Sequence, residues 1–74
     1  MSVVTSSPLE VETLRDGVVI LRMNRPAQLN AMNVELVDAL HAELDRLAGD
    51  TTCRVVVLTG AGRGFCSGLD LGGF

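Results

Sequence analysis

The stretch Val55–Gly73, VVVLTGAGRGFCSGLDLGG, places the tightest constraint on how this chain can fold. An apolar run ends at Gly60, and a nearly uncharged segment with five further glycines follows it. Glycine adopts positive φ without steric cost and lets a ligand approach the main chain closely. Backbone N–H groups that are unpaired beyond a strand can bind anionic groups. The sequence therefore predicts a strand followed by a loop whose own main chain takes part in binding or chemistry.

Two strands are predicted upstream of this loop. Leu9–Arg15 alternates apolar and polar residues, the pattern of a half-exposed strand. Asp16-Gly17 is a typical hairpin turn, and the apolar, β-branched run Val18–Met23 is typical of a strand that is covered on both faces. Residues 1–8 show no periodicity and are expected to form a flexible lead-in.

A helix is predicted next, because Pro26 ends the second strand and Asn33 is a good N-cap. Gly49 is expected at the C′ position. The predicted apolar face of this helix consists of Leu36, Val37, Leu40, Leu44 and Leu47. A second buried strand is expected at Val55–Thr59, which completes an α/β unit of ββαβ order. Ligands of open α/β sheets bind beyond the carboxyl ends of the strands, where the glycine-rich loop begins.

Composition excludes several classes of function. The net charge is −3, and all six basic residues are Arg, without interleaved aromatic side chains, so nucleic acid is not expected as a partner. No apolar run approaches the roughly 20 residues that span a bilayer, and no export signal is visible, so we expect a cytoplasmic protein with no membrane contact. Cys53 and Cys66 are then expected to be free thiols. No metal site is expected.

Size and hydrophobicity bear on domain organisation. A hydrophobic fraction of 47% is high for a soluble chain of 74 residues and is typical of a piece of a larger core. We therefore expect the chain to be a fragment of a larger folded unit.

Three kinds of chemistry can be considered for the loop. Gly60-x-Gly62 after a strand suggests a nucleotide-binding turn, but Phe65 occupies the third glycine position, the chain has no Lys for a phosphate loop, and no helix is predicted to follow. Gly64-Phe65-Cys66-Ser67-Gly68 has the spacing of a nucleophile elbow with Cys66 as nucleophile. Its base would have to be His41, which flanks the apolar stripe of the predicted helix, so a packing role for Cys66 is favoured.

The third possibility is an oxyanion site made of main-chain N–H groups. Acyl transfer and enolate chemistry need donors fixed where negative charge develops on a carbonyl oxygen, and one such donor contributes about 3 kcal/mol. The turn Gly68-Leu69-Asp70 beyond a strand can supply such an N–H. Spacing alone does not choose between these alternatives.

Three motifs favour the third one: NRPxxxNAMN from Asn24, RVVVLTG from Arg54 and GFCSGLDL from Gly64. In this order and spacing, from about Leu9 to Leu71, the chain resembles the crotonase family of enoyl-CoA hydratases and isomerases. The resemblance implies the N-terminal ββαβ portion of the crotonase-like spiral fold, with residues 9–74 as the N-terminal part of a single, incomplete domain. It also implies that the Leu69 N–H is one of two oxyanion-hole donors to an acyl-CoA thioester.

The resemblance further implies a CoA-binding set. It comprises Arg25, Ala27, Gln28, Leu29, Ala31, Ser67, Gly68, Leu69, Asp70 and Leu71. Within it, Arg25 is expected either to face the CoA phosphates or to be structural, and Asp70 to accept loop hydrogen bonds rather than to catalyse. Asn30 and Asn33 are interpreted as turn and cap residues. Several members of the family carry a basic residue where this chain has Ala27. The family commonly has the smaller Ala where this chain has Leu69.

The function expected from this resemblance is that of an acyl-CoA-binding enzyme, most simply an enoyl-CoA hydratase or isomerase. CoA would be part of the substrate, with no other cofactor, and the whole protein would be a homotrimer or homohexamer. The second oxyanion donor and the proton-transferring glutamates of the family come later than Phe74. A non-catalytic truncated fragment, or another reaction of the family such as acyl-CoA hydrolysis, is the alternative.

Overall fold

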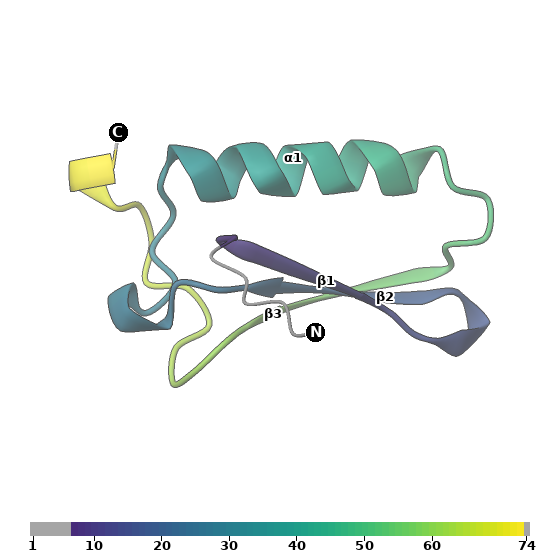
Figure 1. Ribbon diagram of the computed structural model, residues 1–74, viewed down its shortest axis with the longest axis horizontal. Coiled ribbons are helices and arrows are strands. Elements are labelled where there is room, and N and C mark those ends of the chain that lie inside the picture. The colour runs from purple at the N-terminus through teal and green to yellow at the C-terminus, as the bar shows by residue number, and fades with distance from the viewer. Residues whose placement is uncertain (1–6, 74) are drawn as a thin grey trace.

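The computed structural model describes residues 7–73, so Met1–Ser6 of the predicted lead-in and Phe74 lie outside the described residues. One sheet of order β1-β2-β3 lies beneath a single long helix (Figure 1). Its elements are β1 (Leu9–Thr13), β2 (Val18–Met23), α1 (Val34–Ala48) and β3 (Val55–Gly60). β1 and β2 are antiparallel, whereas β2 and β3 are parallel and joined by the α1 crossover. The predicted ββαβ order is confirmed.

The hairpin between β1 and β2 forms at the predicted turn. Asp16 and Gly17 both have positive φ, 65° and 77°, within a short 3₁₀ segment, Arg15–Gly17. The Leu14 N–H donates to the Val18 carbonyl at 2.7 Å, so β1 ends at Thr13 rather than at Arg15. This turn sets the register in which Leu9 lies opposite Met23.

Helix α1 begins and ends at the predicted residues. The Asn33 side chain accepts a hydrogen bond from the Leu36 N–H at 2.9 Å, which satisfies one of the free N–H groups of the first turn. Gly49 follows the last helical residue, and its N–H donates to the carbonyls of Arg46 and Leu47. Gly49 is the C-cap residue, so its predicted C′ position was wrong, and its φ of −93° is not the left-handed conformation that favours glycine at C′.

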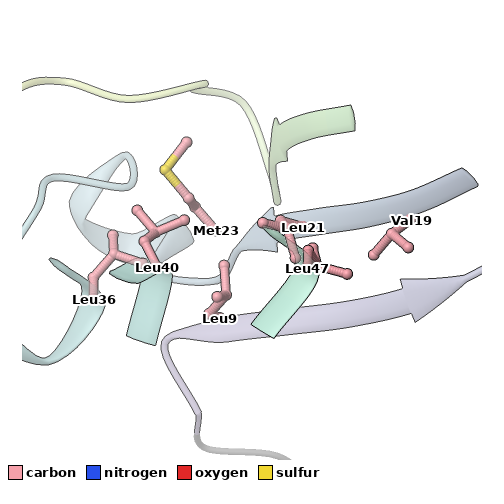
Figure 2. Close-up of a cluster of buried hydrophobic side chains, with 7 residues drawn as sticks. All are labelled: Leu9, Val19, Leu21, Met23, Leu36, Leu40 and Leu47. Atoms are coloured by element: carbon pink, nitrogen blue, oxygen red, sulfur yellow. The ribbon is translucent and has the colours of Figure 1, made fainter. Parts of the chain in front are cut away.

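The core lies between α1 and the face of the sheet beneath it. It consists of Leu9, Val19, Leu21, Met23, Leu36, Leu40 and Leu47 (Figure 2). On β2 the buried residues alternate with half-buried ones, because successive side chains of a strand point to opposite faces. The core therefore fixes β2, whose carboxyl end leads into the candidate site. Within residues 7–73, no helix is both long and apolar enough to cross a bilayer.

Burial differs from the prediction at both parallel strands. On β2 only one face is buried, and the other, with Val18 and Ile20, is half-buried. The prediction of a buried β3 was wrong for this chain, since its four apolar side chains are 39–51% exposed. Leu44, which was placed on the buried helix face, is 46% exposed. The physical reason is that a single helix covers one face of part of the sheet, so β3 receives little cover.

Candidate functional site

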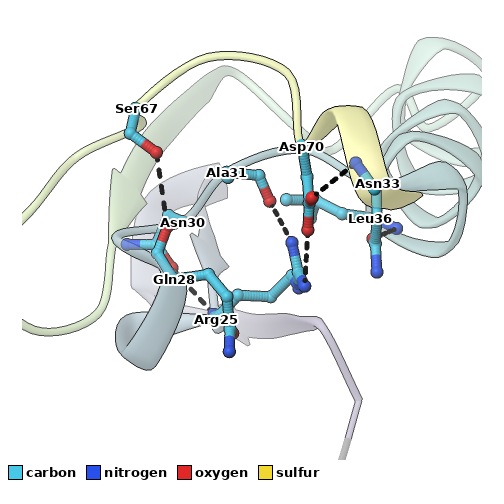
Figure 3. Close-up of polar contacts among 9 residues, drawn as sticks. Arg25, Gln28, Asn30, Ala31, Asn33, Leu36, Ser67 and Asp70 are labelled. Atoms are coloured by element: carbon cyan, nitrogen blue, oxygen red, sulfur yellow. Dashed lines mark hydrogen bonds and ion pairs between the residues drawn. The ribbon is translucent and has the colours of Figure 1, made fainter. Parts of the chain in front are cut away.

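Two segments leave the sheet side by side at the carboxyl ends of the parallel strands. Met23 pairs with Gly60, so β2 and β3 end at the same level. The connector, residues 25–32, follows β2, and the glycine-rich loop, residues 61–70, follows β3. The connector contains a 3₁₀ turn, Pro26–Gln28, and the two segments contact each other along their length (Figure 3). This is the edge at which the sequence predicts ligand binding.

Asn30 fastens the connector to the loop. It is fully buried, and its Nδ2 donates to the carbonyls of Ala61 at 2.9 Å and Gly64 at 2.7 Å. Its Oδ1 accepts the Arg25 N–H at 2.7 Å. Asn30 has a φ of 58°, a left-handed conformation that Asn tolerates better than most residues. A side chain at Gly60 would lie 2.6 Å from the Asn30 amide, so glycine allows this close approach.

A short parallel β-bridge joins Met32 to Leu69. The Met32 N–H donates to the Gly68 carbonyl, and the Asp70 N–H donates to the Met32 carbonyl, both at 2.8 Å. Neighbouring peptide groups of an extended chain point in opposite directions, so the Leu69 N–H points away from Met32. Among the hydrogen bonds of residues 7–73, none uses the Leu69 N–H as donor.

The surroundings of this N–H are open. Gly68 has a φ of 109°, which side chains rarely adopt, and a Cβ built there would meet no atom within 4 Å. The Leu69 side chain is 64% exposed. The Leu69 N–H is thus an unpaired backbone donor in an exposed part of the loop.

Arg25 of the connector and Asp70 of the loop form an ion pair (Figure 3). Arg25 Nη2 lies 3.1 Å from Asp70 Oδ2, and Arg25 Nη1 donates to the Ala31 carbonyl. Asp70 Oδ1 also accepts the Gly72 N–H at 3.1 Å, so Asp70 receives loop hydrogen bonds as expected. The two side chains are 16% and 28% exposed.

The other residues of the predicted CoA-binding set lie around this unit. The Ser67 N–H donates to the Leu29 carbonyl at 3.1 Å, and Ser67 Oγ lies 3.3 Å from the Gln28 carbonyl, which it approaches as donor. Ala27 is exposed on the 3₁₀ turn, and Leu71, at 83%, is the most exposed large apolar residue among those described. Ser67 thus joins Gln28 and Leu29 of the connector to the loop, whereas Ala27 and Leu71 make no such contact among the described hydrogen bonds.

The two alternative chemistries lack support in the geometry. Within residues 61–73 no α-helix follows Gly60-x-Gly62, only a 3₁₀ segment, Leu71–Gly73, so a nucleotide loop at a helix N-terminus is excluded there. Cys66 is half-buried and packs against the core, whereas His41 is exposed on α1. No hydrogen bond joins Cys66 to His41 in the described part of the chain. The packing role for Cys66 agrees with this.

Met32 is the part of the site that sequence analysis missed as a functional position. It contributes through its backbone, and its half-buried side chain packs against the core. Its role becomes visible only when the connector and the glycine-rich loop are seen paired in the structure. An open cavity of about 310 Å³ lies elsewhere, between the end of α1 and the start of β3, and is lined by Leu44, Leu47, Ala48, Cys53, Arg54, Val55 and Val56.

Comparison with known proteins places this fold and loop in a class. The family model for enoyl-CoA hydratase/isomerase matches residues 13–74. The chain therefore belongs to the enoyl-CoA hydratase/isomerase family, and its ββαβ unit is the N-terminal portion of the crotonase fold.

Individual relatives make the likeness more particular. A probable enoyl-CoA hydratase of Mycobacterium leprae is 50% identical over 56 residues, which cover 76% of this chain and 19% of the relative. The 1,2-epoxyphenylacetyl-CoA isomerase of Escherichia coli is 49% identical over 55 residues, 74% of this chain and 21% of that protein. The crystal structure of an enoyl-CoA hydratase from Mycobacterium marinum superimposes with a TM-score of 0.82 at 41% identity, covering 86% of this chain and 32% of the other. The chain thus spans about a fifth of the length of the first two relatives.

Proposed function

We propose that this chain supplies the thioester-binding half of an acyl-CoA active site of the enoyl-CoA hydratase/isomerase type. The unpaired Leu69 N–H would donate to the thioester carbonyl oxygen, where negative charge develops when the enoyl group is hydrated or its double bond is shifted. The single observation that carries the proposal is that the bridge to Met32 leaves the Leu69 N–H unpaired and pointing away from Met32.

The groups that move protons are proposed to lie outside this segment. Asp70 is the only acid in residues 61–73, and its carboxylate is occupied by Arg25 and by the Gly72 N–H. Both carboxylate oxygens are therefore engaged by groups of the chain itself rather than directed at a substrate. The described residues therefore bind and polarise the substrate, whereas a second donor and the catalytic carboxylates come from further polypeptide.

The remaining features of the proposal follow from the family. The substrate is an acyl-CoA, and CoA serves as part of it, without a separate cofactor or metal. Gln28, Leu29, Ser67 and Leu71 would line the entry of the pantetheine arm. We place the whole protein in the cytoplasm as a homotrimer or homohexamer with no nucleic-acid or membrane partner.

The test removes one N–H group. In the complete gene product that carries this sequence, Leu69→Pro deletes the donor, and Leu69→Ala keeps it while shortening the side chain. Hydration or isomerisation of crotonyl-CoA and longer 2- and 3-enoyl-CoA substrates is followed by loss or gain of the conjugated thioester absorbance. We expect Leu69→Pro to lower kcat by about 10²–10³-fold and Leu69→Ala to retain most of it.

Two controls make the result decisive. Replacing Leu69 by its α-hydroxy acid analogue exchanges the N–H for an ester oxygen with little change of shape, and it should reproduce the loss seen with proline. Product analysis separates hydration and isomerisation from release of free CoA, which would indicate hydrolysis. Equal activity of the proline, ester and alanine proteins, or no binding of any acyl-CoA by calorimetry, would disprove the proposed role.

A further inference from the structure

We infer that Arg25 is a positioning residue that holds the Leu69 N–H toward the substrate, and that it is not a contact for the CoA phosphates. This inference rests on the proposed function of the Leu69 N–H. It concerns a side chain for which sequence alone left both roles open.

The contacts of Arg25 lie on both sides of the β-bridge. Ala31, whose carbonyl accepts from Nη1, precedes Met32, and Asp70, which pairs with Nη2 at 3.1 Å, follows Leu69. One guanidinium therefore contacts a neighbour of each bridge partner. Arg25 and Asp70 are 45 positions apart in the sequence, so the contact joins the connector to the loop. The planar fork of Arg suits this geometry, because two donors are fixed relative to each other.

The arrangement restricts rotation of the peptide groups around Leu69. Asp70 is held at three points: its N–H by Met32, Oδ2 by Arg25 and Oδ1 by the Gly72 N–H. The Leu69 N–H belongs to the preceding Gly68–Leu69 peptide, whose carbonyl accepts the Met32 N–H, so the bridge that Arg25 braces through Ala31 and Asp70 sets its direction. With Arg25 in place, the neighbouring Leu69 N–H keeps its outward direction before substrate arrives, which is the preorganisation that an oxyanion donor requires.

Phosphate binding by Arg25 conflicts with the same contacts. Both terminal nitrogens are engaged, and only 16% of the side chain is exposed. A phosphate that approached the guanidinium would meet the Asp70 carboxylate, which has the same sign of charge.

The experiment compares substrates with and without the nucleotide. Arg25→Gln and Arg25→Lys are prepared in the complete gene product and assayed with crotonyl-CoA and with crotonyl-pantetheine, which has no nucleotide phosphates. We expect Arg25→Gln to lower kcat by about 10–100-fold on both substrates with little change in KM, because a displacement of about 1 Å can cost 10²-fold. Arg25→Lys keeps the charge but can serve only one partner well, and its kcat should lie between Arg25→Gln and wild type.

Arg22→Gln is the matched control. Arg22 also forms ion pairs, with Glu10 at 3.6 Å and Glu12 at 3.3 Å, but these partners lie on β1 and belong to neither the connector nor the loop. Its removal should leave kcat and KM unchanged. A rise in KM that is confined to crotonyl-CoA in the Arg25 variants would overturn the inference, as would unchanged kinetics.

Hydrogen exchange measures the same variants without substrate. We expect the Asp70 amide, which is bonded to the Met32 carbonyl, to exchange at least 10-fold faster in Arg25→Gln than in wild type or Arg22→Gln. Unchanged exchange at Asp70 would contradict the inference, whatever the activity. A third outcome is that the wild-type protein acts on neither thioester while the Asp70 amide still exchanges faster in Arg25→Gln. In that case the proposed function is wrong, but the role of Arg25 in holding the loop is still supported.

Discussion

The Asn30 side chain makes three hydrogen bonds in the described site. A fully buried amide is stable only when its hydrogen-bonding groups are satisfied, and here Oδ1 has one donor and Nδ2 has two acceptors. The polarity of the amide matters as much as its shape, since both partners of Nδ2 are carbonyl oxygens. An oxygen in that position would face Ala61 and Gly64 without a proton to share.

Exchange of a single atom tests this. Asn30→Asp should lower the free energy of unfolding by about 3 kcal/mol, because it buries a carboxylate oxygen against two carbonyl oxygens. The matched variant, Asn33→Asp, should change stability little, since Asn33 only accepts from the Leu36 N–H and Asp is an equally good N-cap. Denaturant unfolding of both variants measures the difference. Similar stability of the two would contradict the polarity assigned to the Asn30 amide.

These two residues also show what sequence can predict at this scale. The capping role of Asn33 depends on its neighbours in the chain and was predicted correctly. The turn role expected for Asn30 agrees with its left-handed φ, but its contacts lie 31 and 34 positions away, and no local pattern indicates them. The same holds for Arg25 and Asp70, whose pairing required the two segments to be placed in space.

At the scale of elements, the connection from α1 to β3 is held by its own side chains. Asp50 Oδ1 accepts hydrogen bonds from the Thr52 N–H at 2.9 Å and the Thr52 hydroxyl at 2.6 Å. The side-chain hydrogen bond from Thr52 is the main cause that lowers the pKa of Asp50 below its ordinary value of 3.8, and the Thr52 backbone N–H is the next. The turn is thus preorganised for the start of β3 when Asp50 is ionised.

The lowered pKa gives a pH dependence of known sign. The contribution of ionised Asp50 to stability is complete above the ordinary pKa of 3.8 and is lost as the pH falls through the lower pKa of the folded state. Thr52→Val removes the hydroxyl donor but keeps the backbone donor, so the pKa of Asp50 should rise part of the way toward 3.8. Carboxyl ¹³C NMR titration measures it, with Thr51→Val as the control. An Asp50 midpoint that is the same in both variants would contradict the assigned cause.

At the scale of the whole molecule, β3 is the one strand within residues 7–73 that has no buried residue. In parallel register, Val56 and Leu58 face the same side as the buried Val19 and Leu21 of β2, yet they are 39% and 43% exposed. Val55 and Val57 are exposed on the other side. The apolar sequence correctly predicted a strand, but burial depends on what packs against it. The described residues provide only α1 for that purpose, which is why the burial of β3 was mispredicted.

An uncovered apolar edge strand promotes association between chains. The 74-residue chain produced alone should therefore show a weight-average mass that increases with concentration in sedimentation experiments. Val57→Lys should reduce this association. Val11→Lys is the matched control, because both side chains are 41% exposed but Val11 lies between Glu10 and Glu12 on β1. Equal effects of the two substitutions would show that β3 is not the associating surface.

The bridge between Met32 and Leu69 has a consequence for how loop length can vary. Outward and inward N–H groups alternate along an extended chain, so a slip of one position against Met32 would turn the Leu69 amide inward and a neighbouring amide outward. A slip of two positions would again give an outward amide, but from another residue. Whether the loop shifts by an odd or an even number of residues against Met32 thus decides which peptide N–H faces the ligand. The ion pair to Asp70 fixes this alignment, so residues at the tip of the loop can be gained or lost without inverting the site.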